Sequence, residues 1–558
     1  MRTPRFGGRL RGLLALGLAP LLSLGAAIAV TAWGPGADAL NRLYAGLFTG
    51  VLLQGLLLGV CLLARRPAGL TLKRALSISH GWAGAALGAM LFIICISGAL
   101  AVLKPELRRW EMPSERSVFS TAFAIDDVFQ QGRHAFPLAS AWRLEWPDDH
   151  TPTLRIQAAG PQQRGREPVP ALSFPFAAPL YGDLSGLLSR LHSNLYAGFP
   201  GRILVSLFGF GLTLLVLGGL VLHPRQAGSV LRLRRRSGLR TLAYDSHKLA
   251  GLWLLPLLLL IATTGIFSGL GALGTVQLAP YAFPDQPGRV MQELMPSYAR
   301  PALGQAADMA SLDELLRRHH HAQPGFQMHS MTVHHWGDSH AYATVQGTQR
   351  WQLSTPLFER YHYALADLSL LHHDSAAQRG LFTQGFIAIQ PLHFAQYAGP
   401  ASRWLHALGG LAAALLAASG VWLWLQRHTK APPGPRRAPW LAGLMLGLML
   451  ACCTLFAVTA LSPDTWPLRA RWQSWSFALA WISGLLACLL PVTSLRRRSH
   501  CLLRLSSLLL LVAASASLLR AGTESAPVDL APLLINLILL SMAALLWQGG
   551  RQLARTSS

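Results

Sequence analysis

Four histidines occupy matched positions in two copies of one sequence pattern. His80 and His247 each begin an apolar stretch, and Ser-Gly or Thr-Gly follows seventeen residues later. His192 and His393 each lie in a Leu-His motif that ends in Tyr-Ala-Gly. Neutral imidazoles are common metal ligands, and histidines on membrane helices can hold haem iron. The residue types and their spacing therefore indicate axial ligation of a metal cofactor.

The elements that must position these histidines are long and apolar. Of the 558 residues, 52% are hydrophobic and 13% are charged, which is too apolar for a soluble protein of this length. Ten stretches are long enough to cross a bilayer as helices. They lie near 12–32, 43–63, 77–103, 202–222, 249–270, 404–425, 441–461, 475–493, 501–519 and 531–547. We expect a predominantly α-helical polytopic membrane protein with about ten spans.

The formal net charge of +24 is concentrated in alternate loops between these stretches. Arginines precede the first stretch, fill the loop at 232–240 and recur at 496–498. For a protein of the bacterial inner membrane, the positive-inside rule then places both termini on the cytoplasmic side. The charge thus reflects topology, so we expect the lipid bilayer, and no nucleic acid, as a partner.

The two copies of the pattern cover 77–225 and 244–427 and cross the membrane in the same direction. Such a parallel duplication, related by an axis along the membrane normal, places matched residues opposite one another. His80 should then face His247 near the cytoplasmic side, and His192 should face His393 near the periplasmic side. Two axial histidines from different helices suit b-type haem, so we expect two haems per chain.

The spans and the duplication divide the chain into four parts. They are two N-terminal helices (1–70), a first repeat (71–225) with a periplasmic insertion at 104–190, a second repeat (226–430) with an insertion at 272–400, and four C-terminal helices (431–558). Each insertion shows the pattern of a helix followed by two strands. The predicted helices are 126–133 and 311–320, and the predicted strands are 141–146, 153–157, 328–335 and 340–345. Both insertions are therefore expected to be α+β.

Other polar residues near these spans allow two interpretations each. Arg202 and Arg403 lie ten residues past the outer histidines, where they could bind haem propionates or anchor the helix at the interface. His406 has no counterpart in the first repeat, where Val205 stands, so a packing role is favoured over a third ligand. Ten histidines between 319 and 373 leave a second metal site open, although they lack HExxH or zinc-finger spacing.

The motifs SHxxAG, with Ser/Thr-Gly seventeen residues after the histidine, and LHxxxYAG resemble the PepSY-associated transmembrane helix family over about 77–427. Members of that family include di-haem inner-membrane reductases that help to release iron from ferric siderophores in the periplasm. The resemblance implies PepSY-like insertions and haem ligation by His80, His192, His247 and His393. It also implies an oxidoreductase that passes electrons outward to a ferric chelate. Short members lack the two N-terminal and four C-terminal helices.

The electron donor is expected to be a quinol or a cytoplasmic reductase, because the sequence contains no soluble cofactor fingerprint. Two other functions stay open at this stage. One is a haem-free permease for an iron–siderophore, with a midplane site between the repeats. The other is a regulatory module whose insertions bind a periplasmic protein.

Overall fold

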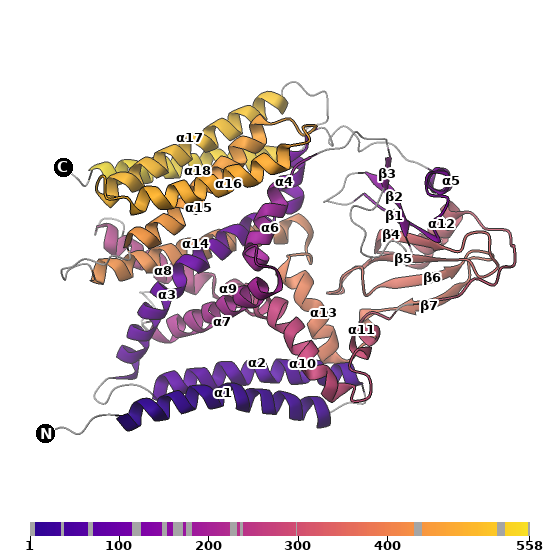
Figure 1. Cartoon of the computed structure of the whole chain (residues 1–558), viewed down its shortest axis with the longest axis horizontal. Helices are drawn as coiled ribbons and strands as arrows, with labels where there is room; N and C mark the ends of the chain where they lie inside the picture. The colour runs from indigo at the N-terminus through magenta and orange to yellow at the C-terminus, as the bar shows by residue number, and fades with distance from the viewer. Residues whose placement is uncertain are drawn as a thin grey trace.

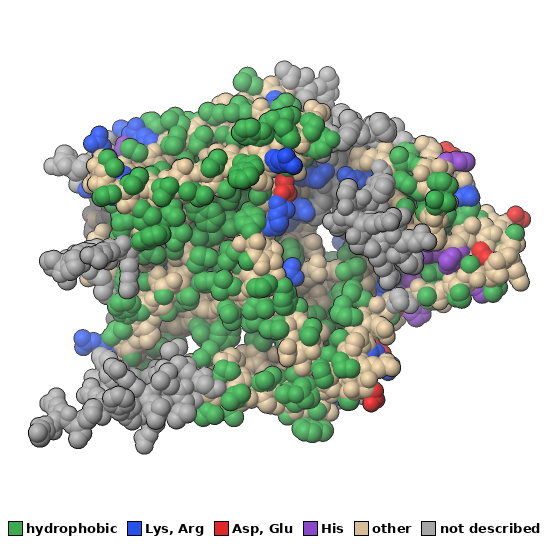
Figure 2. Space-filling model, in the orientation of Figure 1, with side chains coloured by type: hydrophobic (Ala, Val, Ile, Leu, Met, Phe, Trp, Pro, Cys, Tyr) green, Lys and Arg blue, Asp and Glu red, His purple; other side chains and the backbone are tan. Residues whose placement is uncertain are grey.

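The computed structural model describes residues 6–34, 38–64, 71–113, 124–147, 153–159, 171–174, 181–223, 232–234, 238–296, 298–428, 438–521 and 530–555. A bundle of long helices carries a β-sheet at one end (Figure 1). The first helix begins, and the last helix ends, on the side of the bundle away from the sheet. Hydrophobic side chains cover most of the visible face of the bundle, whereas most of the histidines in view lie at the sheet end (Figure 2).

All ten apolar stretches are helical. They lie in α1 (Phe6–Trp33), α2 (Ala39–Ala64), α3 (Leu72–Ala101), α7 (Gly198–Leu222), α8 (Leu239–Trp253) with α9 (Leu255–Ile266), α14 (Gly399–His428), α15 (Ala438–Leu461), α16 (Arg469–Leu489), α17 (Leu495–Ala521) and α18 (Leu530–Arg555). Within the described residues, eight helical segments are long and apolar enough to cross a membrane. The other two stretches belong to α1, whose apolar part is Leu18–Trp33, and to α16. The predominantly helical polytopic fold predicted from the sequence is confirmed.

The fifth stretch is interrupted, unlike its counterpart α3. The helix breaks at Leu254 (φ −91°, ψ 4°), just before Pro256. Proline has no N–H for the helical bond and its ring clashes with the carbonyl four residues earlier, so α8 ends there. Beyond α9 the run continues toward the sheet end of the bundle (Figure 1) through a π-helical turn, η4 (Phe267–Gly271), and α10 (Ala272–Ala282), past the insertion boundary expected at 272.

The strands of both insertions join in one antiparallel sheet. The strands are β1 (Ala141–Glu145), β2 (Leu154–Ala159), β3 (Ala171–Phe174), β4 (Phe326–His334), β5 (Tyr342–Gln349), β6 (Arg360–Ala364) and β7 (Leu370–Asp374). Their order in the sheet is β3-β2-β1-β4-β5-β6-β7. The predicted strands are present, but the sequence did not indicate that β1 of the first repeat pairs with β4 of the second. The repeats are thus joined outside the membrane as well as within it.

A pair of helices, α5 (Ile125–Ala135) and α12 (Leu312–Ala322), belongs to the same two insertions. Asp313 accepts hydrogen bonds from the backbone N–H groups of Ile125 and Asp126, both at 3.0 Å. In return, Asp126 accepts one from the N–H of Leu312 at 2.8 Å. Because the first N–H groups of a helix have no partner within it, each insertion completes the helix of the other.

Two further short helices precede α7 and α14 and carry the outer histidines. They are α6 (Leu184–Asn194) and α13 (Leu381–His393). The remaining short α-helices of the described residues are α4 (Lys104–Glu111), which follows α3, and α11 (Arg289–Leu294), which follows α10, and a 3-10 helix, η5 (Ala376–Gln378), precedes α13. Each repeat therefore consists of one long helical run toward the sheet, an insertion, a short helix and one long helix back.

Candidate functional site formed by two histidine pairs

The four histidines singled out in the sequence lie together as two pairs. The ring centres of His192 and His393 are 6.0 Å apart, with an angle of 17° between the ring planes. Those of His80 and His247 are 6.4 Å apart, with an angle of 89°. When two imidazoles bind the same metal ion from opposite sides, with metal–nitrogen distances of about 2 Å, their ring centres lie about 6 Å apart. Both separations therefore fit one metal ion between two axial imidazoles.

The outer histidines stand on their own short helices, which explains why they precede the apolar stretches by about ten residues. His192 lies in the last turn of α6 and His393 is the last residue of α13. A turn with positive φ values separates each short helix from the long helix after it, at Leu195 (51°) and Gly198 (61°) in the first repeat and at Gly399 (59°) in the second. Left-handed residues of this kind commonly end helices. The Tyr-Ala-Gly part of the motif thus marks a helix break.

Hydrogen bonds at Nδ1 fix three of the four rings. Nδ1 of His192 lies 2.8 Å from the carbonyl oxygen of Ile94, and Nδ1 of His393 lies 2.9 Å from Thr264 Oγ1. Nδ1 of His247 lies 3.0 Å from Ser419 Oγ. A ligating histidine usually holds its second ring nitrogen in such a bond, which sets the tautomer and leaves Nε2 available to the metal.

His80 differs from the other three. Its buried Nδ1 has no side-chain partner among the residues that the structure describes, and it lies near the backbone carbonyl of Leu215 without a well-aligned hydrogen bond. The residue that matches Ser419 in the first repeat is Gly218, which has no hydroxyl group to offer. The inner pair is therefore held asymmetrically, by a side-chain hydroxyl on one side only.

Each of the four rings packs against a glycine of a neighbouring helix. A Cβ atom added to Gly98 would lie 2.6 Å from Cε1 of His192, and one on Gly265 would lie 3.3 Å from Cε1 of His393. The corresponding distances to the inner histidines are 3.4 Å for Gly219 and His80, and 3.1 Å for Gly420 and His247. The rings occupy the space that larger residues would take, so these glycines let the imidazoles approach the helix backbone closely.

Two of these glycines were missed in the sequence. Gly98 and Gly265 belong to the Ser/Thr-Gly motif, but Gly219 and Gly420 were not singled out. Both follow the outer histidine of their repeat by 27 residues, so the matched spacing was a visible signal.

Helix α3 shows how far apart the two pairs are. It carries His80 near its start, and its Gly98 contacts His192 of the outer pair. Eighteen residues of α-helix rise about 27 Å. The two pairs thus lie at two depths of the bundle, the inner pair away from the sheet and the outer pair on the sheet side.

The two arginines considered as propionate partners have different surroundings. Arg403 forms an ion pair with Glu106 of α4, with its Nε 2.9 Å and its terminal nitrogen 2.8 Å from Oε1, and both side chains are largely buried. The side chain of Arg202 is exposed. A role for either residue in holding propionates stays a prediction.

His406, on α14, lies near the outer pair but is not one of its two members. Its Nδ1 is 3.1 Å from the carbonyl oxygen of Ser402, and its Nε2 is 3.1 Å from that of Leu392. These contacts tie α13 to α14 across the turn between them. They are consistent with the packing role that the broken symmetry favours.

The histidines of the outer segment are parts of the sheet and its helices. Within the described residues, no group of three or more His, Cys, Asp and Glu side chains is arranged to hold a metal ion. His362 lies between Thr344 and Asp374, with its Nδ1 2.9 Å from Thr344 Oγ1 and its Nε2 3.3 Å from Asp374 Oδ2. His319 is buried, with its Nδ1 2.8 Å from the hydroxyl of Tyr363.

Burial lowers the pKa of His319 from 6.5 to about 4, and this makes the sheet sensitive to acid. Below pH 6.5 the unfolded chain binds a proton that the folded one does not, so stability falls as the pH drops from 6.5 to about 4. At about 1.4 kcal/mol per pKa unit, the loss is on the order of 3 kcal/mol. Pulse proteolysis of the full-length protein in detergent, with fragments from 312–374 as the readout, should show this loss. H319F should reduce this loss, whereas the share that comes from His334, whose pKa burial also lowers to about 4, should remain. An unchanged pH profile in H319F would contradict the assignment.

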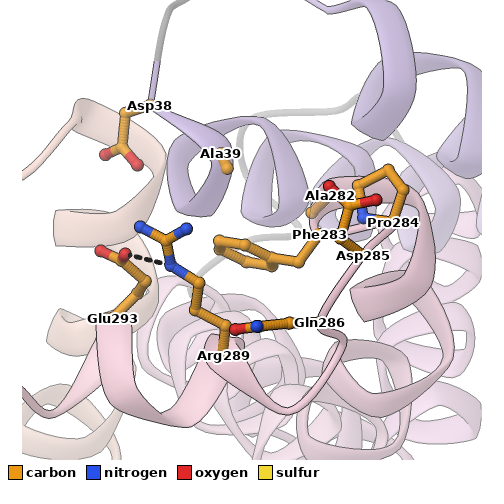
Figure 3. Close-up of a pocket in the computed structure, with 9 residues that line it drawn as sticks. All are labelled: Asp38, Ala39, Ala282, Phe283, Pro284, Asp285, Gln286, Arg289 and Glu293. Atoms are coloured by element: carbon orange, nitrogen blue, oxygen red, sulfur yellow. Dashed lines mark hydrogen bonds and ion pairs between the residues drawn. The ribbon is translucent and has the colours of Figure 1, made fainter.

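A cavity of about 570 Å³ lies at the outer rim, where α2 begins and α10 ends (Figure 3). Arg289 and Glu293 are ion-paired at its edge, with 2.9 Å between Nε and Oε1. None of the four histidines lines it. The cavity is therefore separate from the histidine pairs.

Comparison with known proteins places this geometry in a family. The family model of the PepSY-associated TM region matches residues 78–427, which include all four histidines. An uncharacterized protein of Pseudomonas aeruginosa is 45% identical over 315 residues, which are 55% of this chain and 80% of that protein. The family match covers both repeats and the insertions between their helices. The chain belongs to the family of membrane proteins with a PepSY-associated transmembrane region.

Proposed function

We propose that the chain is a di-haem b electron-transfer protein that passes electrons outward across the bacterial inner membrane. It would reduce a ferric chelate, such as a ferric siderophore, in the periplasm and so serve iron acquisition. One observation carries the proposal. Two pairs of imidazoles have the ring-centre separation of two axial ligands of one metal ion, at two depths of a membrane bundle.

The donor set fits two b-type haems. His80 with His247, and His192 with His393, each offer two imidazoles from different helices, and three of the four are oriented through Nδ1. A bound b-type haem supplies a one-electron couple whose potential depends on its axial ligands and its burial. The chain's own contribution is to place the four imidazoles, to fix their tautomers and to keep glycine backbone beside them.

The arrangement of the bundle supports this direction of transfer. The inner pair lies toward the side where the termini are, which the positive-inside rule assigns to the cytoplasm, so a quinol or a cytoplasmic reductase is the expected donor. The outer pair lies toward the sheet and thus toward a periplasmic acceptor. Addition of one electron converts Fe(III) to Fe(II), which binds hard oxygen donors more weakly, so the chelate releases its iron.

Anaerobic mixing of the reduced protein with a ferric hydroxamate tests this function. Protein reduced with dithionite and freed of excess reductant should lose its reduced haem bands, while a chromogenic Fe(II) chelator captures up to two Fe(II) per chain. The gallium complex of the same hydroxamate, which resists reduction, should leave the bands unchanged. Haem bands that stay reduced beside the ferric complex would contradict the proposal. Uptake of the intact complex by vesicles without a reductant would favour a permease.

The ring angles predict two different electron paramagnetic resonance signals from the oxidised protein. The planes of the axial imidazoles split the iron dπ orbitals, so nearly parallel planes give a rhombic low-spin spectrum and perpendicular planes give one with a single large g value. The outer pair, at 17°, should give the first signal and the inner pair, at 89°, the second. H393A should remove only the rhombic signal. Two signals of the same type would contradict this geometry.

A further inference from the structure

Two groups of helices lie outside the family match, and each touches one of the helices that carry the outer histidines. We call α1 and α2 the N-terminal unit, and α15 to α18 the C-terminal unit. The N-terminal unit packs beside α10 and α13 of the second repeat, and the C-terminal unit packs beside α3, α4 and α6 of the first (Figure 1). Each unit therefore makes most of its contacts with the core with a different repeat.

The N-terminal unit caps the first turn of α13 through Asn41. Oδ1 of Asn41, near the start of α2, accepts hydrogen bonds from the N–H groups of Phe382 at 2.8 Å and Thr383 at 3.4 Å. The approach requires Gly380, since a Cβ atom there would lie 2.4 Å from Cγ of Asn41. One turn further along, Tyr44 stacks on Phe386, with ring centres 4.0 Å apart and an angle of 15° between the rings.

The C-terminal unit holds the first turn of α6 in the same way through Gln473. Oε1 of Gln473, a fully buried residue of α16, accepts a hydrogen bond from the N–H of Asp183 at 2.7 Å. Its Nε2 donates to Glu111 Oε1 at 2.8 Å, and that same oxygen accepts the N–H of Leu184 at 3.1 Å. One buried amide thus joins α16 to both ends of the first insertion.

Arg469, one turn before Gln473, strengthens this junction. Its side chain is fully buried. Its guanidinium donates to the carbonyl oxygens of Tyr181 at 3.1 Å and Glu111 at 2.9 Å, and to that of Thr459 within the C-terminal unit at 2.8 Å. These bonds hold the chain where the insertion leaves α4 and where it returns to α6.

We propose that Asn41 and Gln473 are positioning residues for the outer histidine pair, each acting through the first turn of a histidine-bearing helix. With 11 and 13 residues, α6 and α13 are too short to be stable without contacts. Each ends in a left-handed turn just after its histidine, so the first turn is the other point at which its rotation and tilt can be fixed. A rotated helix moves its imidazole away from the partner ring. This inference rests on the proposed function, in which the outer pair holds a haem.

The test uses full-length protein and follows the outer haem by its rhombic signal and by its release to a haem-free acceptor protein. N41L and Q473M remove the acceptor oxygen at similar side-chain size. Loss of a second-sphere partner commonly weakens binding 10- to 100-fold. Asn41 and Gln473 act one step further out, through the helix, so we expect the outer haem to be released about tenfold faster, and its g values to shift, in either variant. The inner signal should stay unchanged, and N41D, which keeps an acceptor oxygen, should behave as the wild type does.

Matched controls remove one hydrogen bond inside each unit. Q54M removes the bond from Ser23 Oγ to Gln54 Oε1 within the N-terminal unit, and W481F removes the bond from Trp481 Nε1 to Leu444 within the C-terminal unit. Both controls should release the outer haem at the wild-type rate. Wild-type signals and release rates in both N41L and Q473M, or equal changes in the controls, would overturn the inference. A wild-type protein that binds no haem would instead overturn the proposed function.

Discussion

In H393A protein we expect one haem b per chain in place of two, with the rhombic low-spin signal lost. His393 faces His192 at 6.0 Å between ring centres, so its removal leaves the outer site with a single imidazole. H406A is the matched control, because His406 lies close by on α14 but has both ring nitrogens beside backbone carbonyl oxygens. The haem content of both variants, purified side by side, gives the answer. Loss of haem in H406A with retention in H393A would reassign the ligand.

The substitution G98A, which adds a single methyl group, should weaken binding of the outer haem as strongly as loss of a second-sphere partner does. The added Cβ would lie 2.6 Å from Cε1 and 2.7 Å from Nδ1 of His192, so the imidazole must move. Overpacking of this kind costs about 1–3 kcal/mol, which corresponds to roughly a 10- to 100-fold loss of haem affinity if the ring alone gives way.

G84A is the control for G98A. Gly84 lies on the same helix, and a Cβ atom there meets nothing within 4 Å. Both substitutions raise the intrinsic helix propensity of α3 by about 1 kcal/mol, so a difference between them reports the contact with His192. Haem titration of the two apoproteins measures it. Equal affinities of G98A and G84A for the outer haem would show that the close approach has no effect on ligation.

The internal repeat made the pairing of the histidines predictable. Matched positions in a parallel duplication must face one another across its axis, and no local signal is needed to pair His80 with His247 or His192 with His393. The hydrophobic stretches were equally informative, because an apolar run of about 20 residues has few alternatives to a membrane helix. The internal repeat and the apolar stretches together were sufficient to predict the helical fold and the pairing of the four histidines.

Other features depend on contacts between distant segments, which leave weak traces in a single sequence. The pairing of β1 with β4 joins residues such as Trp142 and Val333, and neither strand shows by itself which partner it takes. Glu106 has no counterpart in the second repeat, so its ion pair with Arg403 could not be inferred from symmetry. Asn41 and Gln473 are ordinary helix residues until their distant partners, the N–H groups of Phe382 and Asp183, are known.

The break at Leu254 and the separate helices α6 and α13 were only partly predictable from the sequence. Pro256 was a visible signal for the first. The turn after His393 includes Ala395, a non-glycine residue with φ of 56°, and such a conformation is imposed by tertiary packing. Sequence hydropathy therefore places His393 before the membrane helix but does not show that it ends a helix of its own.

The most direct test is a pyridine haemochromogen assay with a reduced minus oxidised spectrum, on wild-type protein purified in detergent after haem-replete expression. The arrangement of two facing imidazole pairs predicts about two b-type haems per chain and reducible bands in the visible range. Protein without haem under these conditions would contradict the account and would leave the four histidines as packing residues of a haem-free membrane protein.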